Sequence, residues 1–98
     1  MKCPPEVAET VLEIIHRAVL SIRLAGYRKD ADYCTLEADH IHNLPGLILD
    51  YRKDKLEYYL NIERPCYVEG LREMPDANPL AFEAQWRKLE KFLQSDAA

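Results

Sequence analysis

Hydrophobic side chains near the start of the chain recur every three or four residues, which is the spacing of one face of an α-helix. Charged residues such as Glu13 and Arg17 lie on the opposite face and form a favourable pair one turn apart. Gly26 follows the last member of the row, where a left-handed residue commonly ends a helix. The pattern predicts a helix over about residues 5–25. Its buried row consists of Val7, Val11, Ile14, Ile15, Ala18, Ile22 and Ala25.

A second helical pattern covers about residues 31–43. Asp30 or Asp32 can cap its first turn, and Asn43 ends it because the residues that follow are Leu44 and Pro45. The apolar side consists of Tyr33, Leu36, Ile41 and Leu44. Glu37 stands in the middle of that side, where a leucine would be expected.

The third segment, residues 46–64, fits two patterns. Its second half alternates between apolar and polar residues, which suits a strand, but Leu56, Tyr59 and Leu60 also follow helical spacing and Pro65 supplies a stop. An isolated hairpin would need sheet partners that no other segment offers. We therefore expect a helix over residues 46–64, with a break allowed near residue 53.

The last helix is expected at residues 79–94. A loop with a few apolar anchors spans residues 66–78, after which Asn78 caps the helix and Pro79 opens it. The buried row comprises Phe82, Trp86, Leu89 and Leu93. Residues 95–98 carry no pattern and are expected to be a disordered tail. The four segments together predict one all-α domain over residues 1–98, a compact bundle of four main helices.

The composition agrees with this fold. The chain has 98 residues, of which 48% are hydrophobic and 31% charged, and this balance is typical of a globular domain. No apolar run approaches the ~20 residues that a membrane span needs, and the first residues lack the apolar core of a signal peptide. Cys3, Cys34 and Cys66 are scattered without metal-binding spacing. These features predict a cytoplasmic protein with reduced thiols and no membrane contact.

The charge of the chain argues against nucleic acid as its partner. The net charge is −4, whereas phosphate contacts require clustered lysine and arginine. One stretch is an exception, because residues 14–29 contain bases and no acid, while the preceding turns carry Glu6, Glu9 and Glu13. Such a separation of charge usually reflects a solvated helix whose acids lie near its N-terminus and whose bases lie near its C-terminus.

Glu37 and His40 are the candidate catalytic residues. Three residues apart on a helix, a carboxylate and an imidazole can form a hydrogen bond, and burial or mutual attraction would shift their pKa values. A pair of this kind could transfer protons in a small enzyme. The simpler interpretation is a polar link in the core, in which Glu37 binds a tyrosine or arginine of another helix.

A metal site is a weaker possibility. His40 and His42 are two residues apart and point away from each other on a helix, so they cannot bind one ion together. His42 could instead join Asp39 as half of a site. His16, Glu37 and His40 could approach one another across a helix pair, but no strong ligand spacing is present. We therefore predict no cofactor, and name His16, Glu37 and His40 as weak candidate ligands.

Four tyrosines crowd into residues 51–67 beside lysines and arginines. Such side chains can stack on single-stranded RNA, but tyrosine is also enriched where proteins meet. The segment has more apolar groups than one helical row can bury, which predicts a homo-oligomer, most simply a dimer. The expected interface residues are Tyr51, Tyr58, Tyr59 and Ile62.

The sequence contains no motif of a family that we recognise. The function that it favours is a protein-interaction or regulatory module that self-associates. A small enzyme or metal-binding protein using Glu37 and His40 is the alternative, and an RNA-associated factor is the weaker one.

Overall fold

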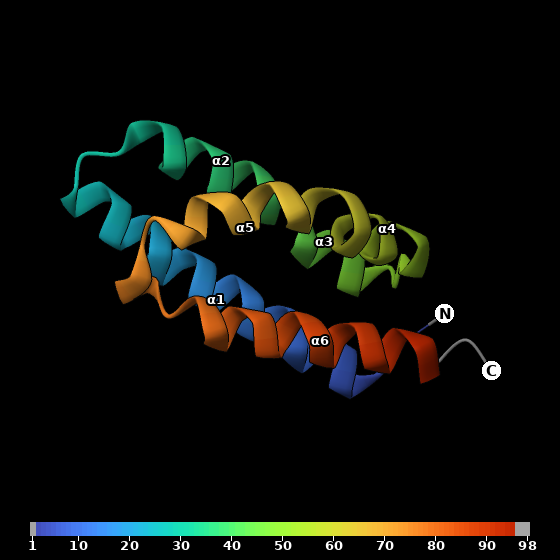
Figure 1. Ribbon diagram of the computed structural model, residues 1–98. Helices are drawn as coiled ribbons and strands as arrows, with labels where there is room; N and C mark the ends of the chain where they lie inside the picture. Colours follow the sequence, from blue (N-terminus) through green and yellow to red (C-terminus); the bar gives the residue numbers. More distant parts are fainter. Residues whose placement is uncertain (1, 96–98) are drawn as a thin grey trace.

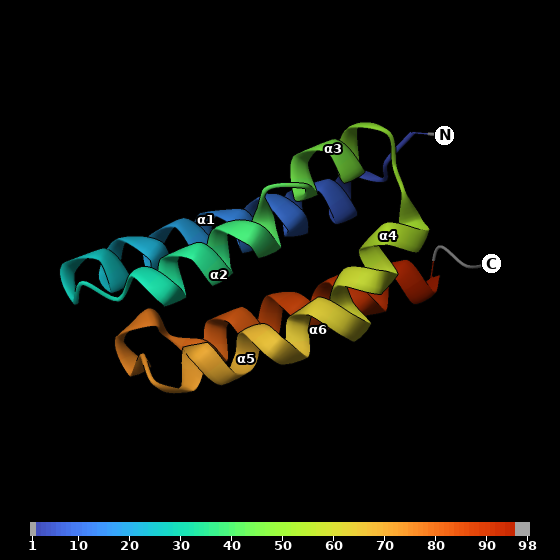
Figure 2. The same ribbon diagram turned by 90° about the horizontal axis from the view of Figure 1, so that it is seen from above.

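Four long helical segments run alternately up and down in the computed structural model, which describes residues 2–95. In chain order they are α1 (Pro5–Tyr27), α2 (Ala31–Ile41), a helix formed by α4, η1 and α5 (53–72), and α6 (Pro79–Ser95). The short α3 (Leu44–Leu49) crosses between the second and third. Figures 1 and 2 show α1 beside α2 and α6, with α5 completing the square. The all-α four-helix bundle expected from the sequence is confirmed.

The end of α1 differs from the expectation. Gly26 lies inside the helix, and Lys29 is the residue in the left-handed conformation, with φ 58°. The amide of Asp30 donates to the carbonyl of Ala25 at 2.9 Å, which closes the helix end in a Schellman-type turn. Asp30 then caps α2, because its carboxylate accepts a hydrogen bond from the amide of Tyr33 at 3.0 Å.

The third segment is helical rather than extended, and its break falls at residues 50–52. There Tyr51 takes a left-handed conformation, with φ 41°, and the amide of Arg52 donates to the carbonyl of Leu47. The helix resumes as α4 (Lys53–Tyr58), continues through the π-helical turn η1 (Tyr59–Glu63), and ends with α5 (Arg64–Arg72). The predicted stop at Pro65 was wrong, as was the predicted loop over residues 66–78, of which only residues 73–78 lie outside α5.

The π-turn explains why Pro65 does not end this helix. Proline lacks an amide proton, and inside a regular helix its ring meets the carbonyl four residues earlier. In η1 the hydrogen bonds span five residues, as the amide of Arg64 donates to the carbonyl of Tyr59. Pro65 thereby falls in the first turn of α5, where a missing donor costs little.

Gly70 brings α2 and α5 close together. A Cβ atom built on Gly70 would lie 2.8 Å from the Cε2 atom of Tyr33, nearer than real Cβ contacts. The glycine is therefore needed for space and not for backbone freedom. Gly70 was expected within the loop over residues 66–78, but it lies near the end of α5.

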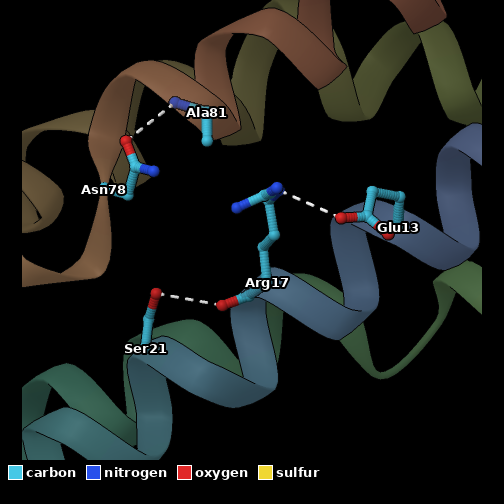
Figure 3. A network of polar contacts seen from close by, with 5 residues as sticks. All are labelled: Glu13, Arg17, Ser21, Asn78 and Ala81. Carbon is cyan, nitrogen blue, oxygen red and sulfur yellow. Dashed lines mark hydrogen bonds and ion pairs between the residues drawn. The ribbon is translucent and has the colours of Figure 1, made fainter.

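The last helix begins and ends close to its predicted bounds. The Asn78 side chain accepts a hydrogen bond from the amide of Ala81 at 3.4 Å (Figure 3). Pro79 is the first helical residue. Trp86 is 1% exposed and packs against Phe82 and Tyr67, as its place in the apolar row predicts. Of the expected tail, Ser95 belongs to α6 and residues 96–98 lie outside the described residues.

Candidate functional site

The second helix places three polar side chains in the interior of the bundle. Tyr33, Glu37 and His40 follow one another at spacings of four and three residues, so they share the inward face of α2. Glu37 is 0% exposed and His40 is 8% exposed, whereas His42 is exposed. The predicted burial of Glu37 and the predicted divergence of the two histidines are both confirmed.

The carboxyl group of Glu37 is buried without a hydrogen-bond partner in the described part of the chain. We expected protein groups to bind it; the hydroxyls of Tyr33 and Ser21 stand near it and act on its pKa, but neither forms a hydrogen bond of regular geometry with it. Burial disfavours the charged form and raises its pKa from the usual value to about 8, although the nearby hydroxyls of Tyr33 and Ser21 lower it in part. Glu37 is therefore neutral at pH 7 and carries a proton that it can donate.

Two hydroxyl groups in the same part of the interior, among the described residues, also lack hydrogen-bond partners. Figure 3 shows the Ser21 hydroxyl turned to its own helix, where it donates to the carbonyl of Arg17 at 3.1 Å. The hydroxyls of Tyr33 and Tyr67 are buried and have no hydrogen-bond partner among residues 2–95. Burial and the neighbouring Glu37 raise the pKa of Tyr33. The interior between α1, α2 and α5 thus holds polar groups that approach one another without pairing.

His40 binds the backbone instead of Glu37. Its Nδ1 atom lies 2.8 Å from the carbonyl oxygen of Leu36, and its Nε2 atom lies 2.9 Å from that of Glu63. Both partners only accept, so a neutral imidazole can donate to one of them and a protonated one to both. The ring also packs 5.1 Å from that of Tyr67. His40 therefore ties α2 to the π-turn, and it does not form the expected acid–base pair.

A cavity of about 470 Å³ opens where α2, α3, α4 and η1 meet. Its size suits a small molecule. Charges of both signs stand on its wall, so electrostatics select no single class of ligand. The lining residues are His40, Asn43, Leu44, Gly46, Leu47, Asp50, Arg52, Lys55, Tyr58, Tyr59 and Glu63. Glu37 is not among them, which separates the two candidate catalytic residues: one stands on the cavity wall and the other is sealed in the core.

The candidate metal ligands do not assemble. His16 is exposed on α1, while Glu37 is enclosed and His40 is engaged by two carbonyl oxygens. Among residues 2–95, no three or more histidine, cysteine, aspartate or glutamate side chains could hold an ion.

The four expected interface residues divide into two pairs. Tyr51 and Tyr59 are buried, and the hydroxyl of Tyr59 accepts a hydrogen bond from the indole of Trp86 at 3.1 Å. Tyr58 and Ile62 are 55% and 54% exposed and stand one turn apart on the outside of the same helix. Only the second pair can meet a partner on the surface. With Tyr51, Tyr59 and Tyr67 all buried, the geometry offers no row of tyrosines to stack on RNA.

Comparison with family models, with curated proteins and with solved structures finds no match to this chain. No helix in the described part of the chain is long and apolar enough to cross a membrane.

Sequence reasoning missed the cavity, the unpaired tyrosine hydroxyls and the engagement of His40 by Glu63. The cavity depends on the angle between α3 and α4, and the His40 contact depends on the π-turn. Neither has a signature in residue spacing. The only available signal was Pro65, because a proline inside an otherwise helical pattern marks a disturbance of the hydrogen-bond ladder.

Proposed function

We propose that this chain is a protein-interaction module that self-associates. The observation that carries the proposal is the number of large apolar side chains on the outside of a bundle that already has a complete core. Most of them form two groups on separate helices. Tyr58 and Ile62 form one group, and the outer face of α1 carries the other: Leu12, Val19, Leu20 and Tyr27.

The Tyr58–Ile62 group is the surface that the sequence singles out. Both side chains lie more than half exposed on neighbouring turns, and Tyr58 also stands on the wall of the 470 Å³ cavity. A side chain of a partner could enter that hollow beside the tyrosine ring. Full burial of either side chain would contribute about 1.5–3 kcal/mol, and tyrosine is a frequent anchor in interfaces.

The polar interior favours an interaction role over catalysis. A proton-transfer pair needs contact with a substrate, and Glu37 has none because its carboxyl group is enclosed. The ring nitrogens of His40 are both occupied by backbone carbonyls. Glu37 and His40 therefore favour a structural role for α2, with the function on the outer faces of the helices.

Light scattering on the full chain at low micromolar concentration and above tests self-association. We expect the mass of at least two chains, and a comparison of Tyr58→Glu with Leu80→Glu tells whether the Tyr58–Ile62 group takes part in the contact between the copies. Leu80 is a matched control because it is a strongly exposed apolar residue on α6, outside both groups. A mass of one chain at every concentration would refute the proposal.

A further inference from the structure

The outer face of α1 combines apolar side chains with a separation of charge. Leu12, His16, Val19 and Arg23 follow each other at spacings of four, three and four residues, so they form one row along the helix. All four are exposed, and Leu20 and Tyr27 flank the row. Positions with this spacing form the seam along which two helices pack in a coiled coil, and here two of the four, Leu12 and Val19, are apolar.

Nothing in the described chain covers this row. The opposite face of α1 packs into the core through residues such as Val11, Ile14 and Ala18, and α2 and α6 flank the helix (Figures 1 and 2). The row is about half exposed at its two apolar positions, Leu12 at 54% and Val19 at 52%. A helix with apolar residues on both its inner and its outer face has a second surface to bury.

The charges along α1 identify the partner. Its first half carries Glu6, Glu9 and Glu13, and from Arg17 onward it carries only bases. Two copies of α1 that cross in opposite directions would bring the acidic half of each beside the basic half of the other. Two parallel copies would place like charges together, which is unfavourable.

The row also has a centre. If a two-fold axis passes beside His16, a residue at a given distance before it faces the residue at the same distance after it in the second copy. Leu12 then meets Leu20, and Glu9 meets Arg23. Leu12 and Leu20 therefore have apolar counterparts and Glu9 has a basic one, whereas Val19 faces Glu13, which is already paired within its own helix.

Glu9 and Arg23 are available for such a contact. Both are exposed, and Glu9 has no ion pair in residues 2–95. Arg23 is held on the surface by Tyr27, whose hydroxyl accepts from its Nε atom at 3.3 Å and whose ring lies 5.8 Å from the guanidinium carbon. Glu13 differs, because it is already paired with Arg17 at 3.1 Å within the helix (Figure 3).

We infer that two copies of this chain pair through the outer faces of their α1 helices, in antiparallel order, with Glu9 of each beside Arg23 of the other. The inference rests on the proposed self-association and specifies its surface. It makes α1 the contact helix, and it leaves Tyr58 and Ile62 outside the pair.

The first test compares Val19→Glu, Tyr58→Glu and Leu80→Glu by light scattering, with far-ultraviolet circular dichroism as a check that each variant folds. A charge in the centre of the row should raise the dimer dissociation constant by at least about tenfold, whereas the other two variants should keep the wild-type mass. Loss of the dimer in Tyr58→Glu alone would overturn the inference and leave self-association standing. Persistence of the dimer in all three variants would overturn it as well. A monomeric wild type would refute both the proposed self-association and the inferred contact through α1.

A charge exchange tests the direction of the helices. Glu9→Arg and Arg23→Glu each place like charges together in the antiparallel pair, so each should weaken the dimer by about tenfold. The double variant restores opposite charges across the interface and should recover wild-type affinity. In a parallel pair each residue faces its own copy, so like charges meet in every variant and neither single variant would weaken the dimer relative to the wild type. If each single variant weakened the dimer and the double variant did not recover the wild-type affinity, the antiparallel order would be overturned.

Discussion

Two neighbouring buried polar clusters, in contact through the rings of Tyr67 and Trp86, are built on opposite principles. Between η1 and α6, the indole of Trp86 donates to the hydroxyl of Tyr59, so two aromatic side chains satisfy each other. Between α1, α2 and α5, the Glu37 carboxyl and the hydroxyls of Tyr33 and Tyr67 are equally buried, yet none has a hydrogen-bond partner among residues 2–95. The difference teaches that burial and hydrogen-bond satisfaction are separate properties of a core.

The two clusters should therefore respond differently to mutation. A buried donor or acceptor that loses its partner costs about 1–3 kcal/mol, while a group that never had one has already incurred that cost. The Trp86–Tyr59 cluster stabilises the bundle. In the Glu37 cluster, by contrast, replacing an unpaired polar group by an apolar one could raise the free energy of unfolding.

The largest effect is expected for Trp86→Ala. Truncation of a buried aromatic side chain costs about 3–5 kcal/mol, and here it also removes the hydrogen bond to Tyr59. That is a large share of the stability of a small domain, so the variant should be unfolded or nearly so. Urea denaturation followed by circular dichroism measures the loss, with exposed Arg87→Ala as the control. A small loss would contradict the central role of this cluster.

The next largest effect is a dependence of the free energy of unfolding on pH, which Glu37 causes. Because the folded state raises the pKa of Glu37 to about 8, it retains a proton that the unfolded chain releases from about pH 4.5 upward. The free energy of unfolding should therefore fall as the pH rises from about 4.5 to about 8, by a few kcal/mol. Glu37→Gln carries no titrating group and should lose this slope.

Denaturation curves across this pH range, with exposed Glu57→Gln as the matched control, isolate the contribution of Glu37. An identical slope in wild type and Glu37→Gln would show that the folded protein lets Glu37 ionise without cost.

The smallest effects are expected for two variants that each delete one hydroxyl, Tyr59→Phe in the first cluster and Tyr67→Phe in the second. They give the most direct comparison of the two clusters. Tyr59→Phe leaves the Trp86 indole without its acceptor and should cost about 1–2 kcal/mol. Tyr67→Phe removes a buried hydroxyl that has no hydrogen-bond partner and should be neutral or stabilising. Thermal unfolding of the two variants and the wild type compares them directly. A larger loss for Tyr67→Phe would mean that its hydroxyl is satisfied in solution, for example by an internal water.

Periodicity was sufficient to predict most of the fold. The apolar rows of α1 and α6 gave both helices to within a few residues, and the buried place of Glu37 followed from the row of α2. The extension of the third helix to Arg72 could not be predicted this way, because Pro65 is a valid stop wherever hydrogen bonds span four residues. A π-turn depends on tertiary packing, which a local pattern does not record.

The candidate site was less predictable than the fold. The position of Glu37 told us that it is buried, but its partners would have come from other helices, and their approach is set by contacts such as Gly70 against Tyr33. The spacing of Glu37 and His40 allowed a hydrogen bond, yet two backbone carbonyls compete for the imidazole and hold it. Spacing states which contacts are possible and not which of them form.

The π-turn at residues 59–63 has a consequence for insertions and deletions. A π-turn holds one residue more than an α-turn, so the helix beyond it is offset by about 100° from where a regular helix would place it. Deletion of a single exposed residue such as Asn61 would remove that offset and rotate Tyr67 and Leu71 out of the core. The connection at residues 73–78 lies between two helices and can change length without this penalty. The number of residues in this one turn of the third helix is thus fixed by the packing of the helix beyond it, even where the residue itself, such as Asn61, is exposed.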